Sequence, residues 1–297
     1  MFRLPHLYSQ TLVLDGYTQS AQFDEFVYHE SLVHPAMLRV AAVTGAPPRR
    51  VFIGGGGELA TAREVLRYPS VEQVVMVDLD ECVVRLCETL LPEWGGTKVT
   101  SDPRFKLFIG DAYQYLMTQP ANTKYDAIIM DISDPVEAGP GIALYTQEFY
   151  QRAASLLTPG GVFVTQSGAA DAVPYQIQER SDSPDCMSLG PIRNTLSQVF
   201  DQALPYSTNI ASFGGDWGFV MAFDLRTEKK HNILDWKKPS HSAIDQLIER
   251  HIQGGADRLH HYDEESHLRM FSLTKQLRKY LEAETRIMTM ENPIYTF

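Results

Sequence analysis

From residue 50 to about residue 225, short apolar runs alternate with segments whose apolar positions recur at helical spacing. Turn residues bound each run, which is typical of buried parallel strands. Alternation of this kind is typical of a doubly wound α/β sheet, the fold class that we predict. The predicted strands are 51–54, 74–78, 105–109, 127–131 and 162–166. The helices predicted between them are 59–67, 81–91, 112–117 and 146–157.

The two ends of the chain have different patterns. Leu12 and Leu14 alternate with polar residues before the turn signal Asp15-Gly16, which predicts a small β-hairpin. Helical spacing follows over 31–42. Residues 202–208 and 217–223 predict two strands that give the sheet an antiparallel edge. We therefore predict an N-terminal β-hairpin region (1–45), a catalytic α/β domain (46–225) and a helical C-terminal appendage (226–297).

Composition narrows the class of protein. The 297 residues have no apolar stretch near the roughly 20 that a membrane helix needs, and the first residues lack the apolar core of a secretory signal. Three cysteines (Cys82, Cys87 and Cys186) have no metal-ligand spacing, so we expect reduced thiols and a cytoplasmic protein. A net charge of −11 argues against nucleic acid and is compatible with a cationic substrate.

Two carboxylates follow the predicted strand 127–131, in the sequence Asp131-Ile132-Ser133-Asp134-Pro135. Ligands of open α/β sheets bind at the carboxyl ends of the strands, where this pair is placed. No Lys or Arg within the motif neutralises them, so the pair suits a cationic substrate or the removal of a proton from one. The alternative is a simple turn, in which an Asp caps the next helix.

A run of four glycines followed by Glu58 links the first core strand to a helix. Glycines there allow a ligand to approach the backbone, and counting from Gly55 the spacing is compatible with a dinucleotide-binding turn. However, Glu58 would place a negative charge where a pyrophosphate should lie. A ligand with a cationic group near Glu58 fits better, unless Glu58 only stabilises the helix dipole.

Acidic residues also end the next two strands. Asp78 lies about 20 residues after the glycines, where an acid accepts the hydroxyls of a ribose. Asp111 follows the third strand, where a carboxylate can accept from an adenine amino group or cap a helix. Asp80 is expected to cap the helix 81–91. Together with Asp131 these residues predict a nucleoside pocket that opens onto a carboxylate pair.

The residues resemble the aminopropyltransferases, the family of spermidine, spermine and thermospermine synthases, from residue 12 to at least residue 223. The shared motifs are Asp24-Glu25-Phe26-x-Tyr28-x-Glu30, the glycine turn with Glu58, Val77-Asp78-x-Asp80, Gly110-Asp111 and Asp131-x-Ser133-Asp134-Pro135. Details such as Tyr28-His29-Glu30-Ser31, Asp134-Pro135-Val136-Glu137 and Asp216-Trp217-Gly218-Phe219 look most like the thermospermine synthases. Departures are Leu59 and Ala112 at positions where the family has glycine, and a shortened N-terminal strand.

The resemblance implies a Rossmann-like, methyltransferase-type domain and decarboxylated S-adenosylmethionine as the aminopropyl donor. It implies no metal or other cofactor, and a homodimer or homotetramer. Asp131 matches the proton acceptor of the family. The residues implied to bind the donor are Gln19, His29, Gly55, Glu58, Asp78, Asp111 and Ala112. Those implied to bind the polyamine are Tyr28, Asp131, Asp134 and Trp217.

The chemistry agrees with this assignment, because a protonated amine must lose a proton before it attacks the carbon next to a sulfonium. We expect spermidine to be converted to thermospermine, with release of 5′-methylthioadenosine. Spermidine or spermine synthase activity is the nearest alternative. A small-molecule methyltransferase is disfavoured because the carboxylate of S-adenosylmethionine would meet Glu58. A binding protein without activity is disfavoured by the intact Tyr28, Asp131 and Asp134.

The C-terminal histidines suggest a metal site only weakly. His260 and His261 are adjacent and therefore point apart on a helix, and His251 and His267 complete no tight ligand set. We predict no metal site there.

Overall fold

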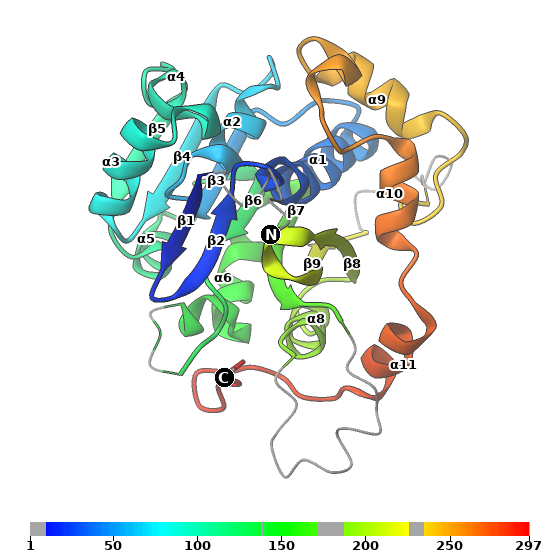
Figure 1. The fold of residues 1–297 in the computed structure, drawn as a ribbon. Helices are drawn as coiled ribbons and strands as arrows, with labels where there is room; N and C mark the ends of the chain where they lie inside the picture. The colour runs from blue at the N-terminus through cyan, green and yellow to red at the C-terminus, as the bar shows by residue number, and fades with distance from the viewer. Residues whose placement is uncertain (1–9, 138, 140, 172–186, 226–234, 297) are drawn as a thin grey trace, which may run out of the picture.

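The computed structural model describes residues 10–137, 139, 141–171, 187–225 and 235–296. Cys186 and the predicted start of the C-terminal appendage, 226–234, lie outside these ranges. Figure 1 shows one central twisted sheet with helices on both of its faces and a two-stranded sheet beside it. The predicted α/β class is confirmed.

The central sheet has seven strands in the order β5-β4-β3-β6-β7-β9-β8. The strands from β3 to β7 pair in parallel, whereas β8 and β9 form an antiparallel edge, as predicted. Their bounds are β3 Arg50–Gly55, β4 Gln73–Asp78, β5 Phe105–Ile109, β6 Tyr125–Asp131, β7 Leu157–Ala169, β8 Gln202–Ile210 and β9 Gly215–Phe223. Because β3 lies between β4 and β6, the carboxyl ends of these three strands meet at one edge.

The two faces of the sheet have separate hydrophobic cores, which explains why the strands are apolar throughout. Ile53, Met76 and Ile129 belong to the core on the α1 face, whereas Phe52 and Ile128 belong to the opposite one. Neighbouring strand residues therefore pack on opposite faces. Helices on the α1 face include α1 Glu25–Thr44, α2 Ala60–Leu66, α4 Gly96–Thr100, α9 Ala243–His251 and α10 Glu264–Phe271. Helices on the opposite face include α5 Ala112–Thr118, α6 Gln147–Leu156, α8 Leu189–Ser197 and α11 Lys275–Ala283.

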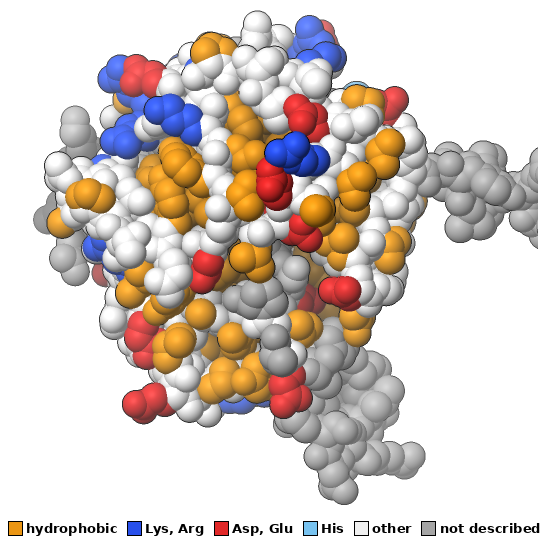
Figure 2. Space-filling model, turned by 90° about the vertical axis from the view of Figure 1, so that its left-hand side faces the viewer, with side chains coloured by type: hydrophobic (Ala, Val, Ile, Leu, Met, Phe, Trp, Pro, Cys, Tyr) orange, Lys and Arg blue, Asp and Glu red, His pale blue; other side chains and the backbone are white. Residues whose placement is uncertain are grey.

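The remaining elements are short or lie at the edges. Asp80 caps α3 Glu81–Leu90, as expected, because its side chain accepts from the N–H groups of Cys82 and Val83. The 3-10 helices are η2 Pro92–Trp94, η3 Ile142–Tyr145, η4 Ala211–Phe213 and η5 Gly255–Arg258. Figure 2 looks onto the side of the molecule where β5 and α3 lie, and hydrophobic side chains reach the surface there.

Helix α1 differs from the prediction. The sequence predicted a helix over 31–42, but α1 begins at Glu25. Both faces of the helix are largely buried, so it has no apolar stripe to signal its start. Pro35 lies inside the helix and lacks the N–H that the carbonyl of Ser31 would accept. The hydroxyl of Tyr206 on β8 donates to this carbonyl instead, at 3.0 Å.

The N-terminal sheet is the predicted hairpin. Strands β1 Thr11–Leu14 and β2 Tyr17–Ala21 are antiparallel, and both residues of the turn, Asp15 and Gly16, have positive φ angles of 51° and 86°. Two positive φ angles are characteristic of the type I′ turn, whose twist matches that of paired strands.

The segment between η5 and α10 is attached to α1. The carboxylate of Glu30 accepts from the backbone N–H groups of His260, His261 and Tyr262, each at 2.8 Å. His267 is fully buried between the Tyr262 hydroxyl and the Trp236 carbonyl. The ring of His267 therefore has structural partners on both sides, whereas His260 and His261 hold Glu30 through their backbone. No helix within the described ranges is long and apolar enough to cross a membrane.

Candidate active site

The glycine turn after β3 brings the acidic strand ends together. Gly55 has a φ of 78°, and a Cβ atom there would lie 2.0 Å from the carbonyl oxygen of Asp131, so only glycine fits. The next residue, Gly56, donates its N–H to the same oxygen at 2.9 Å. A Cβ on Gly57 would lie 2.9 Å from the Asp78 carboxylate. The turn thus lies against both Asp131 and Asp78.

Leu59 ends this turn in a conformation that costs free energy. It is fully buried and has a φ of 75°, in the left-handed region that a residue with a Cβ atom avoids. Such strain costs about 1–2 kcal/mol. A glycine, which the resemblance leads us to expect at this position, would avoid that cost.

Asp131 ends β6 and holds two hydroxyl donors. Its carboxylate accepts from the Tyr28 hydroxyl at 2.7 Å and from the Thr61 hydroxyl at 2.6 Å. Burial and the nearby charge of Glu58 raise the pKa of Asp131 to about 7, against the opposing effects of His29 and the two hydroxyls. A carboxylate with a pKa near neutrality is suited to accept a proton at physiological pH.

His29 lies between two carboxylates, one on each side of its ring. Its Nδ1 lies 2.8 Å from Oε2 and 2.7 Å from the carbonyl oxygen of Glu25, and its Nε2 lies 2.7 Å from Oε1 of Glu58. Burial would lower the pKa of His29, but the two glutamates raise it to about 10. Both ring nitrogens face acceptors, so both carry protons and the ring is an imidazolium.

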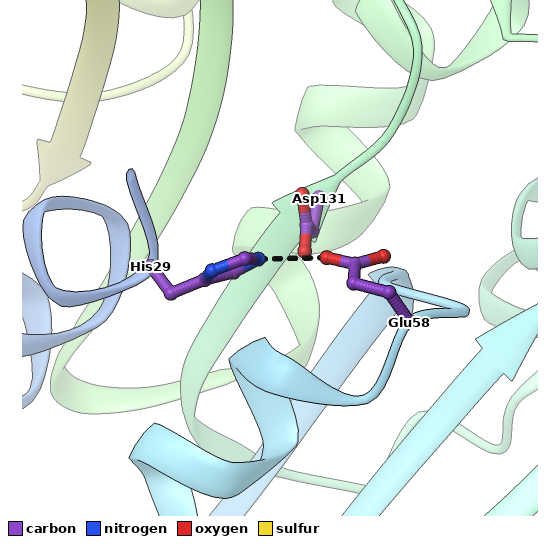
Figure 3. A group of neighbouring side chains, drawn as sticks. All are labelled: His29, Glu58 and Asp131. Carbon is purple, nitrogen blue, oxygen red and sulfur yellow. Dashed lines mark hydrogen bonds and ion pairs between the residues drawn. The ribbon is translucent and has the colours of Figure 1, made fainter. Parts of the chain in front are cut away.

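Glu58 is the more exposed partner of its pair with His29, at 14% against 1%. Burial would raise its pKa, but the hydrogen bond and charge of His29 hold it below the ordinary value. Single ligand atoms of His29, Glu58 and Asp131 lie within 4.8 Å of one another (Figure 3), a spacing that a metal ion could also use. An imidazolium has no lone pair for a metal, however, so the group is better suited to an organic cation.

Arg63 and two glutamates next to the site hold His29 in place. Both terminal nitrogens of Arg63 donate to the carboxylate of Glu25 at 2.9 Å, while its Nε donates to Glu64 at 2.8 Å. Both glutamates are buried and both are paired. This arrangement keeps Glu25 charged and oriented, and Glu25 in turn fixes the ring of His29.

Asp134 is held by a glutamine that the sequence analysis did not single out. The amide nitrogen of Gln166 on β7 lies 2.9 Å from Oδ1 of Asp134 and 2.8 Å from the Tyr145 hydroxyl. The oxygen of the same amide accepts from the indole N–H of Trp217 at 3.1 Å. Burial raises the pKa of Asp134, and Gln166 opposes this. Trp217 also packs against Phe213, so it is both a packing residue and part of this cluster.

Of the other predicted donor residues, Asp78, Asp111 and Ala112 lie at the ends of β4 and β5, whereas Gln19 lies within β2. Burial raises the pKa of Asp78, whose carboxylate accepts from the backbone N–H of Asp80. Asp111 caps α5 by accepting from the N–H of Tyr113 at 2.8 Å, and Ala112 is the buried first residue of that helix. The Gln19 amide donates to the Tyr17 carbonyl at 3.4 Å within β2. For all of the predicted donor residues, ligand binding stays a prediction.

Three residues of the site escaped the sequence analysis as candidates: Glu25, Thr61 and Gln166. Thr61 is the second residue of α2 and directly follows the glycine turn that carries Glu58, but no local pattern marked it as a site residue. Gln166 had a signal, because it ends a predicted strand next to the one that carries Asp131. Glu25 lies one helical turn before His29 and could have been found from that spacing.

Comparison with known proteins decides the family. Residues 25–232 match the spermine/spermidine synthase domain. The chain is 41% identical over 288 residues to polyamine aminopropyltransferase 2 of Hyperthermus butylicus, covering 96% of this chain and 84% of the relative. The chain belongs to the spermine/spermidine synthase family. It is a polyamine aminopropyltransferase, and the family's donor, decarboxylated S-adenosylmethionine, is a co-substrate, as the sequence predicted.

Other relatives agree with this placement. The polyamine aminopropyltransferase of Synechococcus sp. (strain JA-3-3Ab) is 39% identical over 287 residues, covering 96% of this chain and 84% of the relative. A crystal structure of spermidine synthase in complex with the transition state analogue AdoDATO superposes with a TM-score of 0.71 at 26% identity, covering 92% of this chain and 80% of that one. The structure of spermidine synthase from Thermotoga maritima gives a TM-score of 0.69, also at 26% identity and with the same coverage.

Proposed function

We propose that this aminopropyltransferase converts spermidine to thermospermine, with release of 5′-methylthioadenosine. The observation that carries the site assignment is the half-buried carboxylate of Asp131. It is held by two hydroxyls and has a pKa raised toward neutrality beside the cation-binding acid Glu58. A proton acceptor and a cation-binding acid side by side are what transfer to an amine from a cationic donor requires.

We assign each donor-binding residue to the part of decarboxylated S-adenosylmethionine whose charge or hydrogen-bonding groups it complements. Glu58, oriented by the His29 imidazolium, faces the ammonium group of the donor. Asp78 accepts from the ribose hydroxyls, Asp111 and Ala112 lie at the adenine, and Gly55 allows the close backbone approach. Gln19 completes the donor site. The group that most distinguishes this site from one for ordinary S-adenosylmethionine is Glu58, because a carboxylate on the ligand would be repelled there.

The transfer itself needs an amine with a free lone pair. Tyr28 and Asp134 hold the attacking amine, while Trp217 forms part of the wall through its bond to Gln166. Asp131 takes one proton from the amine, whose lone pair then attacks the methylene carbon bonded to sulfur. The carbon–sulfur bond breaks, and the sulfur keeps the electron pair as a neutral thioether. In-line positioning of the amine supplies much of the rate.

The thermospermine assignment rests on the motif details around Tyr28, Asp134 and Trp217. Spermidine synthase activity is the second candidate, because the solved structures that resemble this chain are spermidine synthases. The two activities use the same donor and base and differ in the length of the acceptor.

Product analysis tests the proposal. The protein is incubated with decarboxylated S-adenosylmethionine and, in separate reactions, putrescine, spermidine or spermine, and the products are separated so that thermospermine and spermine are resolved. We expect spermidine to be the best acceptor and thermospermine to be the product. Putrescine as the best acceptor, or spermine as the product from spermidine, would overturn the specificity. No turnover with any of the three would overturn the reaction.

A further inference from the structure

The C-terminal segment 284–296, which we call the strap, ends on the loop that carries Asp134. In Figure 1 it runs from α11 below α8 and on toward the other side of the molecule. The sequence analysis assigned no role to this segment. Thr296 is nearly fully buried, at 4% exposure, which is unusual for a polar residue so close to the end of a chain.

The strap is attached along its length by hydrogen bonds to two helices of the second core. The side-chain amide of Asn194 on α8 donates to the carbonyl of Glu284 at 2.7 Å. The N–H of Met288 donates to the Thr195 hydroxyl at 2.8 Å, and its carbonyl accepts from the N–H of Gln147, the first residue of α6, at 2.9 Å. Met288 itself is fully buried. The strap is therefore an integral part of the fold up to this point.

The last contact of the strap within the described residues is with the loop that carries Asp134. Thr296 donates to the carbonyl oxygen of Pro135 twice, from its backbone N–H at 2.8 Å and from its hydroxyl at 3.2 Å. Pro135 directly follows Asp134, the predicted anchor of the polyamine. A change in the position of Pro135 therefore moves Asp134.

The other carbonyls of this loop have donors from different elements. Gln166 on β7 donates to the carbonyl of Ile132 at 2.7 Å, and the Tyr145 hydroxyl donates to that of Ser133 at 3.0 Å. The carbonyl of Asp134 accepts from Val136 within the loop, at 2.8 Å. The strap thus supplies the bond that holds the loop on the far side of Asp134.

We propose that Thr296 is a positioning residue for the polyamine acceptor: by holding Pro135, the strap sets where the carboxylate of Asp134 meets the incoming amine. This inference rests on the proposed role of Asp134. The proposed donor residues follow β3, β4 and β5, whereas the bonds of the strap described above go to α8, α6 and the loop of Asp134. Loss of the Thr296 bonds should therefore weaken acceptor binding and leave donor binding unchanged.

A matched pair of truncations tests this proposal. One variant ends at Tyr295 and lacks Thr296, and its control ends at Thr296 and lacks only Phe297. Loss of the buried bonds to Pro135 should raise the KM for the polyamine about tenfold in the first variant, with the KM for the donor within about twofold of the full chain. The control should keep the KM for both substrates. Thr296→Val, which loses only the hydroxyl bond, should give a smaller rise in the KM for the polyamine.

Each outcome has one meaning. An unchanged KM for the polyamine in the variant that ends at Tyr295 would overturn the proposal, even if its melting temperature falls, because the strap would then only stabilise the fold. A parallel rise in the KM for both substrates would overturn it too. If the full chain itself shows no transfer to any polyamine, the proposed function fails instead.

Discussion

Replacing Asp131 with asparagine is expected to lower kcat about a thousandfold, within the range that loss of a general base causes. Asparagine has nearly the same shape, and its amide oxygen can still accept from Tyr28 or Thr61, so the pocket should keep its geometry. What is lost is the group that takes the proton from the amine. Steady-state kinetics with saturating donor and acceptor measure the change in kcat.

The control for this variant is Asp126→Asn, at the opposite end of the same strand. Its carboxylate accepts from the backbone N–H groups of Arg49 and Arg50, away from the site. We expect that variant to keep its kcat within about twofold, because this half-buried carboxylate bonds Arg49, Arg50 and Thr158 at the end of the strand away from Asp131. Binding of 5′-methylthioadenosine, measured by calorimetry, should be nearly unchanged in Asp131→Asn. Retention of most of the rate by Asp131→Asn would mean that another group is the base.

Replacing Glu58 with glutamine is expected to raise the KM for decarboxylated S-adenosylmethionine about a hundredfold. Removing one partner of a buried charge pair costs about 2–5 kcal/mol, and about 2.8 kcal/mol corresponds to this factor. The glutamine oxygen can still accept from His29, so the ring should stay in place. The matched control is Glu72→Gln, a surface residue paired with Arg49.

The same variant also tests why the site selects the decarboxylated donor. In the unmodified protein, ordinary S-adenosylmethionine should inhibit weakly, because its carboxylate meets Glu58. In Glu58→Gln that repulsion is gone, so the ratio between the inhibition constant of S-adenosylmethionine and the KM of the donor should shrink. An unchanged ratio would place the ammonium group of the donor elsewhere.

Much of the α/β core could be predicted from the sequence, because apolar runs and turn residues are local signals. Asp78 and Asp131 were placed at strand ends for that reason, and β4 and β6 do end at these residues. The glycine turn was also predictable, because a run of four glycines follows a predicted strand. The structure shows why glycine is needed at position 55: a Cβ atom there would clash with the Asp131 carbonyl.

The parts that could not be predicted depend on packing between distant segments. Helix α1 is buried on both faces, so its periodicity does not mark its start at Glu25. Thr61 meets Asp131 only because β3 pairs with β6, and Gln166 meets Asp134 only because β6 pairs with β7. The bond from Thr296 to Pro135 joins residues 161 positions apart, and no local pattern signals such a contact.

The pH dependence of turnover tests the central claim most directly, that Asp131 is the proton acceptor of a buried network. With both substrates far below their KM values, the rate reports the free protein and free substrates. The rate should fall as the pH drops below about 7, because protonated Asp131 accepts no proton. Tyr28→Phe removes a hydrogen-bond donor to the charged carboxylate of Asp131 and should therefore raise the pKa of that group. The pH below which the rate falls should then be higher in this variant than in the unmodified protein. A rate that stays constant from about pH 5.5 to 8.5 would contradict the assignment of Asp131.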